Sequence, residues 1–182
     1  MQTEAVKPYY EILQKKQIGL IFKRSFDIVV SLIMLLILSP VFLVLAIAIK
    51  LDSKGPVFYR QVRVTQYGKE FRIFKFRTMV NNADKIGSQV TVGGDNRITR
   101  VGKVIRECRL DEIGQLLNIL GGSMTFVGTR PEVPKYVEKY TSEMWATLLL
   151  PAGVTSEASI RYKDEAALLD AAEDVDATYI QD

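Results

Sequence analysis

The feature that most limits how this chain can fold is an uncharged apolar segment, Ile28–Ile49, bounded by Asp27 and Lys50. Its 22 residues exceed the roughly 20 that a helix needs to cross the hydrocarbon core of a bilayer. More than twenty residues precede it and no small-residue cleavage site follows it, so it does not resemble a cleavable signal peptide. At 182 residues, the sequence predicts a membrane segment joined to one small domain.

Two features of this segment conflict with a simple span. Pro40, near the middle, lacks the N–H that would bond to the Leu36 carbonyl, and we expect the Ser39 hydroxyl to bond to the Leu35 carbonyl and bend the helix. Basic residues flank both ends, whereas the positive-inside rule favours an excess on one side. Two interpretations stay open: a kinked single-pass helix, and a re-entrant helix–break–helix whose halves of about eleven residues reach mid-bilayer.

The net charge of +3 conceals an uneven distribution along the chain. Residues 1–110 hold 19 Lys/Arg against 8 Asp/Glu, a balance of +11, whereas residues 111–182 hold 5 against 13, a balance of −8. Because the basic half contains the membrane segment, it indicates attraction to anionic lipid headgroups. Nucleic acid is not expected as a partner, because the basic residues are not interleaved with aromatic side chains in a stacking platform.

Composition also restricts the chemistry that is available. The chain has no histidine and a single cysteine, Cys108. A Ser-His-Asp triad, an imidazole zinc site and an intrachain disulfide are therefore excluded. A general base or nucleophile must come from Asp, Glu, Lys, Tyr, Ser or Thr.

The remainder predicts a small α+β domain that is mostly helical. Residues 56–64 and Glu70–Phe76 alternate in the way that is typical of a short antiparallel strand pair. Helices are expected at 98–108, at Leu110–Leu120 and around Val133–Tyr140. The expected organisation is an interfacial amphipathic helix (1–22), a membrane segment broken at Ser39-Pro40 (23–50), a soluble domain (51–163) and an acidic C-terminal segment (164–182).

Two adjacent carboxylates, Asp111 and Glu112, open the helix that is expected at Leu110–Leu120. The simplest explanation is that acids in a first turn complement the helix dipole. The same position would lower the pKa of a carboxyl group and keep it ionised as a nucleophile or metal ligand, and adjacent carboxylates suit Mg²⁺-assisted phosphoryl transfer. The candidate phosphate ligands, each also explicable as a surface charge, are Lys75, Arg77, Arg106 and Arg130.

Taken in order, several motifs resemble the bacterial sugar transferase family, and among its members the small monotopic phosphoglycosyl transferases. They are the segment with Ser39-Pro40, Phe74–Met79, Asp95–Gly102, Arg109–Leu120 and Gly122–Pro131. The resemblance runs from about Lys23 to Glu132, 110 of the 182 residues. It implies transfer of a sugar-1-phosphate from a UDP-sugar to a polyprenyl (undecaprenyl) phosphate, which releases UMP and starts glycan assembly.

The resemblance also implies roles for particular residues. Asp111 corresponds to the nucleophile, which forms a covalent phosphosugar intermediate in a ping-pong reaction, and Glu112 to its partner in a catalytic dyad. Mg²⁺ is the implied cofactor, associated with Glu112 and Asp111. Contacts to substrate phosphates are implied for Lys75, Arg77, Arg106 and Arg130.

The family's topology is implied in the same way. The Ser39-Pro40 pair implies a re-entrant membrane hairpin, with the active site at the cytoplasmic face of the bacterial inner membrane. Membrane lipids are then expected partners, and later glycosyltransferases of the same pathway are candidate partners.

Several positions depart from the family's pattern. Arg109 stands where a small hydroxyl residue often precedes the Leu-Asp-Glu motif, and Thr129 replaces a proline. The family's Pro-Gly-(Ile/Val)-Thr-Gly pattern changes after Pro151, in a region implied to shape the sugar-nucleotide pocket, so the sugar is left open. One interpretation of the end at Asp182, where relatives usually continue, is a C-terminal truncation.

Two other functions fit the same residues. A direct, single-displacement transferase would use the same substrates without a covalent intermediate. A non-enzymatic membrane scaffold would use its basic face to recruit an acidic partner.

Overall fold

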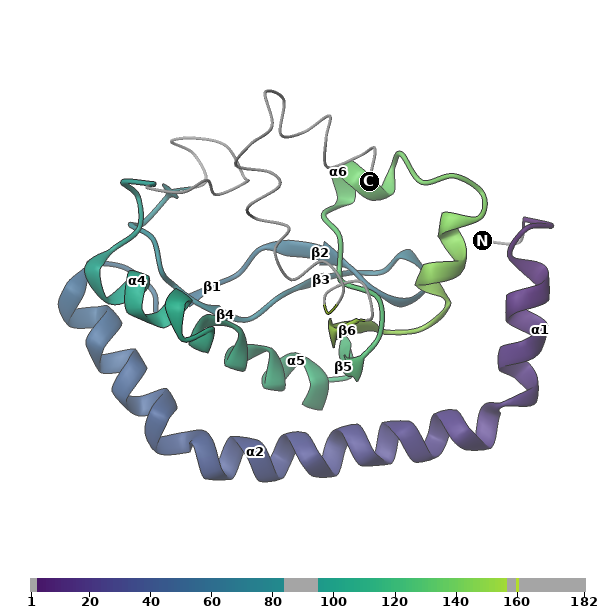
Figure 1. Ribbon diagram of the computed structural model, residues 1–182, viewed down its shortest axis with the longest axis horizontal. Coiled ribbons are helices and arrows are strands. Elements are labelled where there is room, and N and C mark those ends of the chain that lie inside the picture. The colour runs from purple at the N-terminus through teal and green to yellow at the C-terminus, as the bar shows by residue number, and fades with distance from the viewer. Residues whose placement is uncertain (1–2, 84–94, 157–159, 161–182) are drawn as a thin grey trace.

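The computed structural model describes residues 3–83, 95–156 and 160. Over these residues the chain is mostly helical with three small two-stranded sheets, which confirms the predicted α+β class. Figure 1 shows a long helix beneath the other elements and a shorter helix that turns up from its N-terminal end. The acidic segment 164–182 lies outside the described residues, as do residues 84–94.

The long helix, α2 (Gln17–Asp52), contains the whole predicted membrane segment. It follows α1 (Lys7–Lys15), which has Pro8 in its first turn and lies within the predicted interfacial region. α2 is long and apolar enough to cross a membrane, and it is the one such helix among the described residues.

α2 continues through Pro40 as a single helix, and it bends part-way along its length (Figure 1). The Ser39 hydroxyl donates a hydrogen bond to the Leu36 carbonyl at 2.8 Å. The prediction of a bond to the Leu35 carbonyl is therefore wrong. Leu36 carries the carbonyl that Pro40 cannot bond, so the Ser39 hydroxyl supplies the missing donor and the helix continues through the proline.

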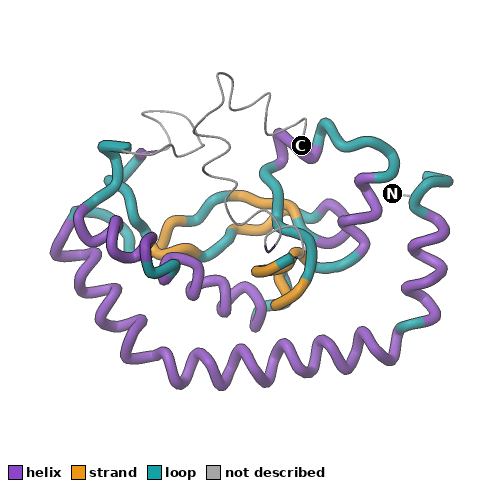
Figure 2. The backbone as a smooth tube through the Cα atoms, viewed as in Figure 1, coloured by secondary structure: helices purple, strands orange, loops and turns teal. Residues whose placement is uncertain are grey.

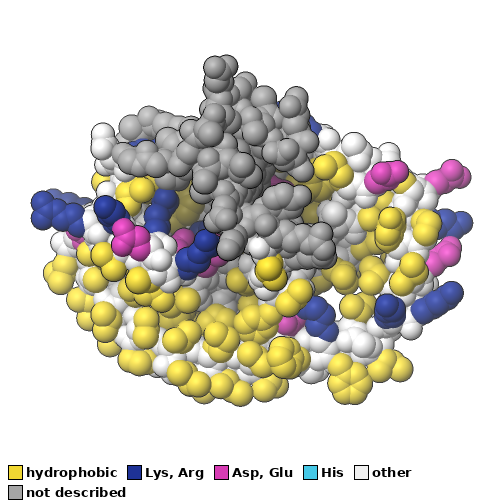
Figure 3. Space-filling model, viewed as in Figure 1, with side chains coloured by type: hydrophobic (Ala, Val, Ile, Leu, Met, Phe, Trp, Pro, Cys, Tyr) yellow, Lys and Arg dark blue, Asp and Glu magenta, His cyan; other side chains and the backbone are white. Residues whose placement is uncertain are grey.

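The two faces of α2 differ in what they contact. Its buried residues, Asp27, Ser31, Leu45 and Ile49, lie on one face and pack against the rest of the chain. The opposite face, which we call the outer stripe, exposes large apolar side chains every three or four residues. The stripe consists of Ile18, Ile21, Phe22, Phe26, Val29, Leu32, Ile33, Leu36, Ile37, Leu43, Val44, Ile47 and Leu51. Figure 3 shows hydrophobic side chains gathered along this edge of the molecule.

Four short strands after α2 form one antiparallel ribbon with an interruption. β1 (Phe58–Tyr59) pairs with β4 (Lys75–Phe76), and β2 (Val62–Val64) pairs with β3 (Glu70–Arg72). This confirms the predicted antiparallel pair. The ladder is interrupted at Phe74, whose backbone N–H bonds to the Asn118 side chain at 2.7 Å instead of to the partner strand.

A parallel strand pair was not predicted. β5 (Met124–Val127) pairs with β6 (Ala152–Thr155), and the connection between them contains α6 (Pro134–Val137) and the 3-10 helix η3 (Met144–Leu149). The two strands approach closely because Gly153 faces Gly128: a Cβ on Gly153 would lie 2.3 Å from the Gly128 nitrogen. Figure 2 shows the strands at the centre, with helices around them.

The helix that was expected at Leu110–Leu120 is divided. α4 (Arg100–Glu107) precedes it, and a 3-10 helix, η2 (Leu110–Gln115), then leads into α5 (Leu116–Leu120). Residues of α5 and β5 pack beneath the ribbon and against α2 in one hydrophobic cluster, and α4 packs with β4 and the end of α2 in another. The long helix therefore contributes to the core of the domain along most of its length.

Candidate functional site

The two adjacent carboxylates lie on η2, next to β4 of the ribbon. The Lys75 ammonium on β4 donates a hydrogen bond to Glu112 Oε1 at 2.7 Å. The two elements come this close because Gly114 faces β4: a Cβ at this position would lie 3.0 Å from the Phe74 carbonyl oxygen. The structure thus pairs two predicted site residues that are 37 positions apart in the sequence.

Burial is the largest influence on both carboxyl groups, and it raises the pKa of each. At Asp111 the charges of Lys75 and Arg106 offset burial only in part, so its pKa stays above the ordinary value. At Glu112 the charge and hydrogen bond of Lys75, together with two nearby arginines, outweigh burial and lower the pKa. The predicted lowering of the Asp111 pKa is therefore wrong, because burial outweighs the favourable charges.

Two of the predicted arginines lie near this pair. Arg106 is half-buried, its Nε donates to the Thr78 hydroxyl at 2.8 Å, and its charge acts on the pKa of Asp111. Arg130 is exposed and lines one small cavity together with Lys75 and Glu112. Three cationic side chains from different parts of the chain therefore surround the two carboxylates, which is an arrangement suited to holding phosphate groups.

Arg77 lies elsewhere. Its side chain is only 5% exposed, and its guanidinium donates to the carbonyls of Ser53 and Lys54 at 2.8 and 2.7 Å. These carbonyls follow the C-terminus of α2, where helix carbonyls lack partners. Arg77 therefore supports the fold at the end of the long helix, and we leave it out of the phosphate-binding set.

The residues present allow a magnesium ion to be held, with help from a substrate. Among the described residues, no group of three or more Asp, Glu, Cys or His side chains could hold a metal ion. Mg²⁺ is commonly bound by one or two carboxylates, with substrate phosphates and water completing its coordination. Asp111 and Glu112 fit that pattern, and Lys75 would have to share Glu112 with the ion.

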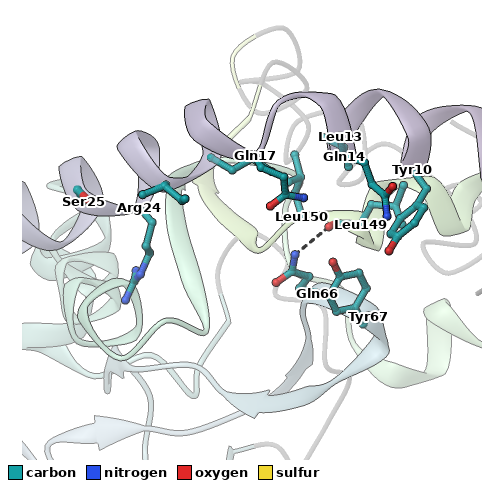
Figure 4. A pocket seen from close by; sticks show the side chains of 12 residues that line it. Tyr10, Leu13, Gln14, Gln17, Arg24, Ser25, Gln66, Tyr67, Leu149 and Leu150 are labelled. Atoms are coloured by element: carbon teal, nitrogen blue, oxygen red, sulfur yellow. Dashed lines mark hydrogen bonds between the residues drawn. The ribbon is translucent and has the colours of Figure 1, made fainter.

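A larger cavity lies away from these groups. It measures about 370 Å³, is open to one side, and is lined by residues of α1, the start of α2, the 3-10 helix η1 (Gln66–Gly68) and the segment at the end of η3. Figure 4 shows amide and tyrosine side chains around it, with Gln66 bonded to the Leu149 carbonyl at 2.9 Å. None of the predicted site residues lines it. We place the candidate site at the smaller cavity because the carboxylates and cations meet there.

Sequence reasoning missed several residues that build the site. Gln115 and Arg63 line the small cavity with Glu112. Within α2, Asp27 accepts hydrogen bonds from the Thr125 hydroxyl at 2.5 Å and the Phe126 backbone N–H at 3.3 Å. Asp27 could have been found by its charge at the edge of an uncharged segment, whereas only burial distinguishes Gln115.

Comparison with known proteins identifies the family to which the sequence is similar. The sequence model of a family described as bacterial sugar transferase matches residues 18–182, more than half of the chain. The chain belongs to the bacterial sugar transferase family. The resemblance seen in the motifs is thereby confirmed, and α1 precedes the matched region.

Relatives in the family carry informative names. An Aeromonas hydrophila UDP-N-acetylgalactosamine-undecaprenyl-phosphate N-acetylgalactosaminephosphotransferase is 44% identical over 67% of this chain and 29% of its own length. A Klebsiella pneumoniae UDP-glucose:undecaprenyl-phosphate glucose-1-phosphate transferase is 43% identical over 79% of this chain and 31% of its own length. A Bacillus subtilis protein, provisionally named undecaprenyl-phosphate N-acetylgalactosaminyl 1-phosphate transferase, is 40% identical over 74% of this chain and 75% of its own length. This chain therefore spans less than a third of the first two relatives and three-quarters of the third.

Proposed function

We propose that this chain transfers a sugar-1-phosphate from a UDP-sugar to undecaprenyl phosphate, and so starts the assembly of a glycan. The observation that carries the proposal is the grouping of Asp111 and Glu112 with Lys75, Arg106 and Arg130 in a member of this family. The relatives' names share undecaprenyl phosphate and differ in the sugar. The substrate class follows from the family, and the identity of the sugar stays open.

In the first step of the proposed mechanism, a carboxylate oxygen of Asp111 attacks the phosphorus that carries the sugar. A bond forms between Asp111 and that phosphorus, the bond to the UMP oxygen breaks, and UMP leaves with the bonding electrons. Lys75, Arg106 and Arg130 stabilise the negative charge that is spread over the phosphoryl oxygens. Partial burial suits this step because it removes water that would weaken those interactions.

In the second step, a phosphate oxygen of undecaprenyl phosphate attacks the same phosphorus. The bond to Asp111 breaks, which regenerates the carboxylate and releases the polyprenyl-diphospho-sugar. Asp111 and Glu112 are the residues that would hold Mg²⁺, which when bound neutralises phosphate charge during the displacement. Glu112 is kept ionised for this role by Lys75, which lowers its pKa.

We further propose that α2 enters and leaves the membrane through one leaflet, and that the site faces the cytoplasm. Asp27, before the uncharged segment, bonds to β5, while Leu45 and Ile49, near its end, pack against Phe76 of the ribbon. If α2 crossed the bilayer, it would carry part of a polar domain into the hydrocarbon core. The outer stripe supplies the surface that contacts lipid, and the bend in α2 (Figure 1) allows both ends of this helix to lie at the same leaflet.

One experiment separates this proposal from the two alternatives. Membranes that contain the protein, supplied with Mg²⁺, undecaprenyl phosphate and a panel of UDP-sugars, should release UMP. Asp111→Asn should abolish release, because an amide is a poor nucleophile, and retained turnover would refute the assignment of the nucleophile. A single-displacement enzyme would release no UMP without undecaprenyl phosphate, and a scaffold would release none under any condition.

A further inference from the structure

Gln115 is a buried polar residue that the mechanism above does not use. It is 3% exposed as a whole residue, and its carboxamide has no hydrogen-bond partner among the described residues. The polar atoms of this carboxamide are not fully buried, so they open on the small cavity. It lines the small cavity with Glu112, Lys75 and Arg130. A 3-10 helix has 3.0 residues per turn, so side chains three positions apart lie one above the other. Gln115 at the end of η2 therefore shares the face of Glu112.

A carboxamide that opens on a cavity can form hydrogen bonds with whatever group enters that cavity. Polar side chains that line a pocket beside titratable groups often fix the orientation of a ligand, which then replaces water as their partner. The neighbours of Gln115 are the groups that we assign to the reaction.

We propose that the Gln115 carboxamide hydrogen-bonds to a hydroxyl group of the sugar nucleotide and so contributes to its binding. The cavity measures about 30 Å³, room for about one water molecule and hence for one hydroxyl group. A carboxamide both donates and accepts, as a hydroxyl does, whereas an ionised phosphate oxygen only accepts. The phosphates already have Lys75 and Arg130, which leaves the hydroxyl as the group that Gln115 matches.

Two hydroxyl-bearing parts of the substrate share this chemistry: the transferred sugar and the ribose of the nucleotide. The inference rests on the proposed function, because a UDP-sugar must bind at this site. It adds a binding residue to the site, and it is tested separately from the nucleophile.

The first measurement compares the wild type with Gln115→Leu, which replaces the amide by an apolar side chain. The KM for the UDP-sugar in UMP release should rise roughly tenfold, the effect of losing about one hydrogen bond. The melting temperature should stay about the same, because the amide makes no hydrogen bond to the described residues that the change could remove. The control is Gln14→Leu, which alters an exposed amide on α1 and should change neither quantity.

The second measurement identifies the source of the hydroxyl. If the sugar supplies it, inhibition by UMP is equally strong in the wild type and in Gln115→Leu. A UDP-sugar analogue that lacks this one hydroxyl group should then bind to the wild type about tenfold more weakly than the complete UDP-sugar does. The variant should bind the analogue and the complete UDP-sugar equally well. If the ribose supplies it, inhibition by UMP weakens by the same factor as the KM rises.

Other results would overturn the inference. An unchanged KM in an active Gln115→Leu enzyme would mean that the cavity holds only water, and the proposed function would stand. A fall in melting temperature without a change in KM would show a purely structural residue. If the wild type released no UMP from any UDP-sugar, the proposed function itself would fail.

Discussion

At the residue scale, the site depends on two neighbouring carboxyl groups that the protein treats differently. Burial raises the pKa of both, but Lys75 bonds only to Glu112, so the pKa of Glu112 falls while that of Asp111 stays raised. A carboxylate with a raised pKa is more basic and hence a better nucleophile once ionised, whereas one with a lowered pKa keeps its charge. This difference fits Asp111 as the nucleophile and Glu112 as the permanently charged partner.

Lys75→Met should therefore move the acid limb of the pH–rate profile. The Lys75 charge lowers the pKa of Asp111, so its removal raises that pKa further and the nucleophile ionises only at higher pH. When UMP release is measured against pH, the acid limb should move to higher pH. This shift is separate from any lower rate that the variant shows at every pH. Lys75→Arg keeps the charge and should restore the limb. An acid limb that stays in place in Lys75→Met would contradict this account.

The variant Arg77→Met tests whether Arg77 stabilises the fold or binds substrate. The change leaves the Ser53 and Lys54 carbonyls without the charged donor they now have, which should destabilise the protein by about 2–3 kcal/mol. Thermal unfolding in detergent should report this loss. The KM for the UDP-sugar should stay unchanged at temperatures where the variant is folded, and a raised KM with unchanged stability would return Arg77 to the phosphate site.

The sequence predicts the grouping of Asp111, Glu112 and Lys75 because their motifs are distinctive. It does not predict the place of Arg77, which a strand pattern would put on the same face as Lys75. β4 ends at Phe76, however, and the following side chain turns to the end of α2, more than twenty residues earlier in the chain. The sequence did not identify Gln115 for a similar reason, because only tertiary packing buries it.

At the element scale, local patterns predicted the elements that depend on neighbours in sequence. The long apolar helix and the antiparallel ribbon belong to this class, because a helix and a hairpin are built from local contacts. The parallel pair of β5 and β6 was missed because no local turn joins its strands. The division of Leu110–Leu120 into η2 and α5 was missed because an apolar periodicity does not distinguish a 3-10 turn from the first turn of an α-helix.

The packing of α4 on the ribbon gives a test at this scale. A Cβ on Gly102 would lie 2.0 Å from the Thr78 carbonyl oxygen, so Gly102→Ala must displace α4 and Arg106 with it. We expect a loss of about 2 kcal/mol or more in unfolding free energy, together with slower UMP release.

Gly19→Ala is the matched control for this change. Gly19 lies within α2, and beyond its own helix no atom comes within 4 Å of the position that a Cβ would occupy. Alanine should therefore leave stability unchanged or raise it by about 0.5–1 kcal/mol. Equal losses in the two variants would mean that the close contact at Gly102 does not exist.

At the scale of the whole molecule, α2 is part of the core and, in the proposed topology, also the anchor. Its outer stripe is exposed from Ile18 to Leu51, while its inner face is covered by the domain from Asp27 to Ile49. Arg24 also connects α2 to the domain, because its guanidinium donates hydrogen bonds to the Ile119 and Leu120 carbonyls at the end of α5. The helix that we propose to contact lipid therefore also holds the element that follows the two carboxylates, which in that topology would keep the site near the membrane surface.

A labelling experiment tests the topology that follows from this arrangement. Single cysteines replace Lys16 and Lys54 in a Cys108→Ser background, because these charged positions are exposed on either side of the uncharged segment and lie outside the outer stripe. A membrane-impermeant maleimide should modify both from the cytoplasmic side. Modification from opposite sides would show a helix that crosses the bilayer.

The central claim, that Asp111 becomes covalently bonded to a phosphosugar, is tested most directly by the mass of the intact protein. The purified protein is exposed to UDP-sugars and Mg²⁺ without undecaprenyl phosphate, so the first step proceeds and the second cannot. We predict a mass increase equal to one sugar phosphate, located on the peptide that carries Asp111 and lost when undecaprenyl phosphate is added. An unmodified protein that still releases UMP once undecaprenyl phosphate is supplied would contradict the claim.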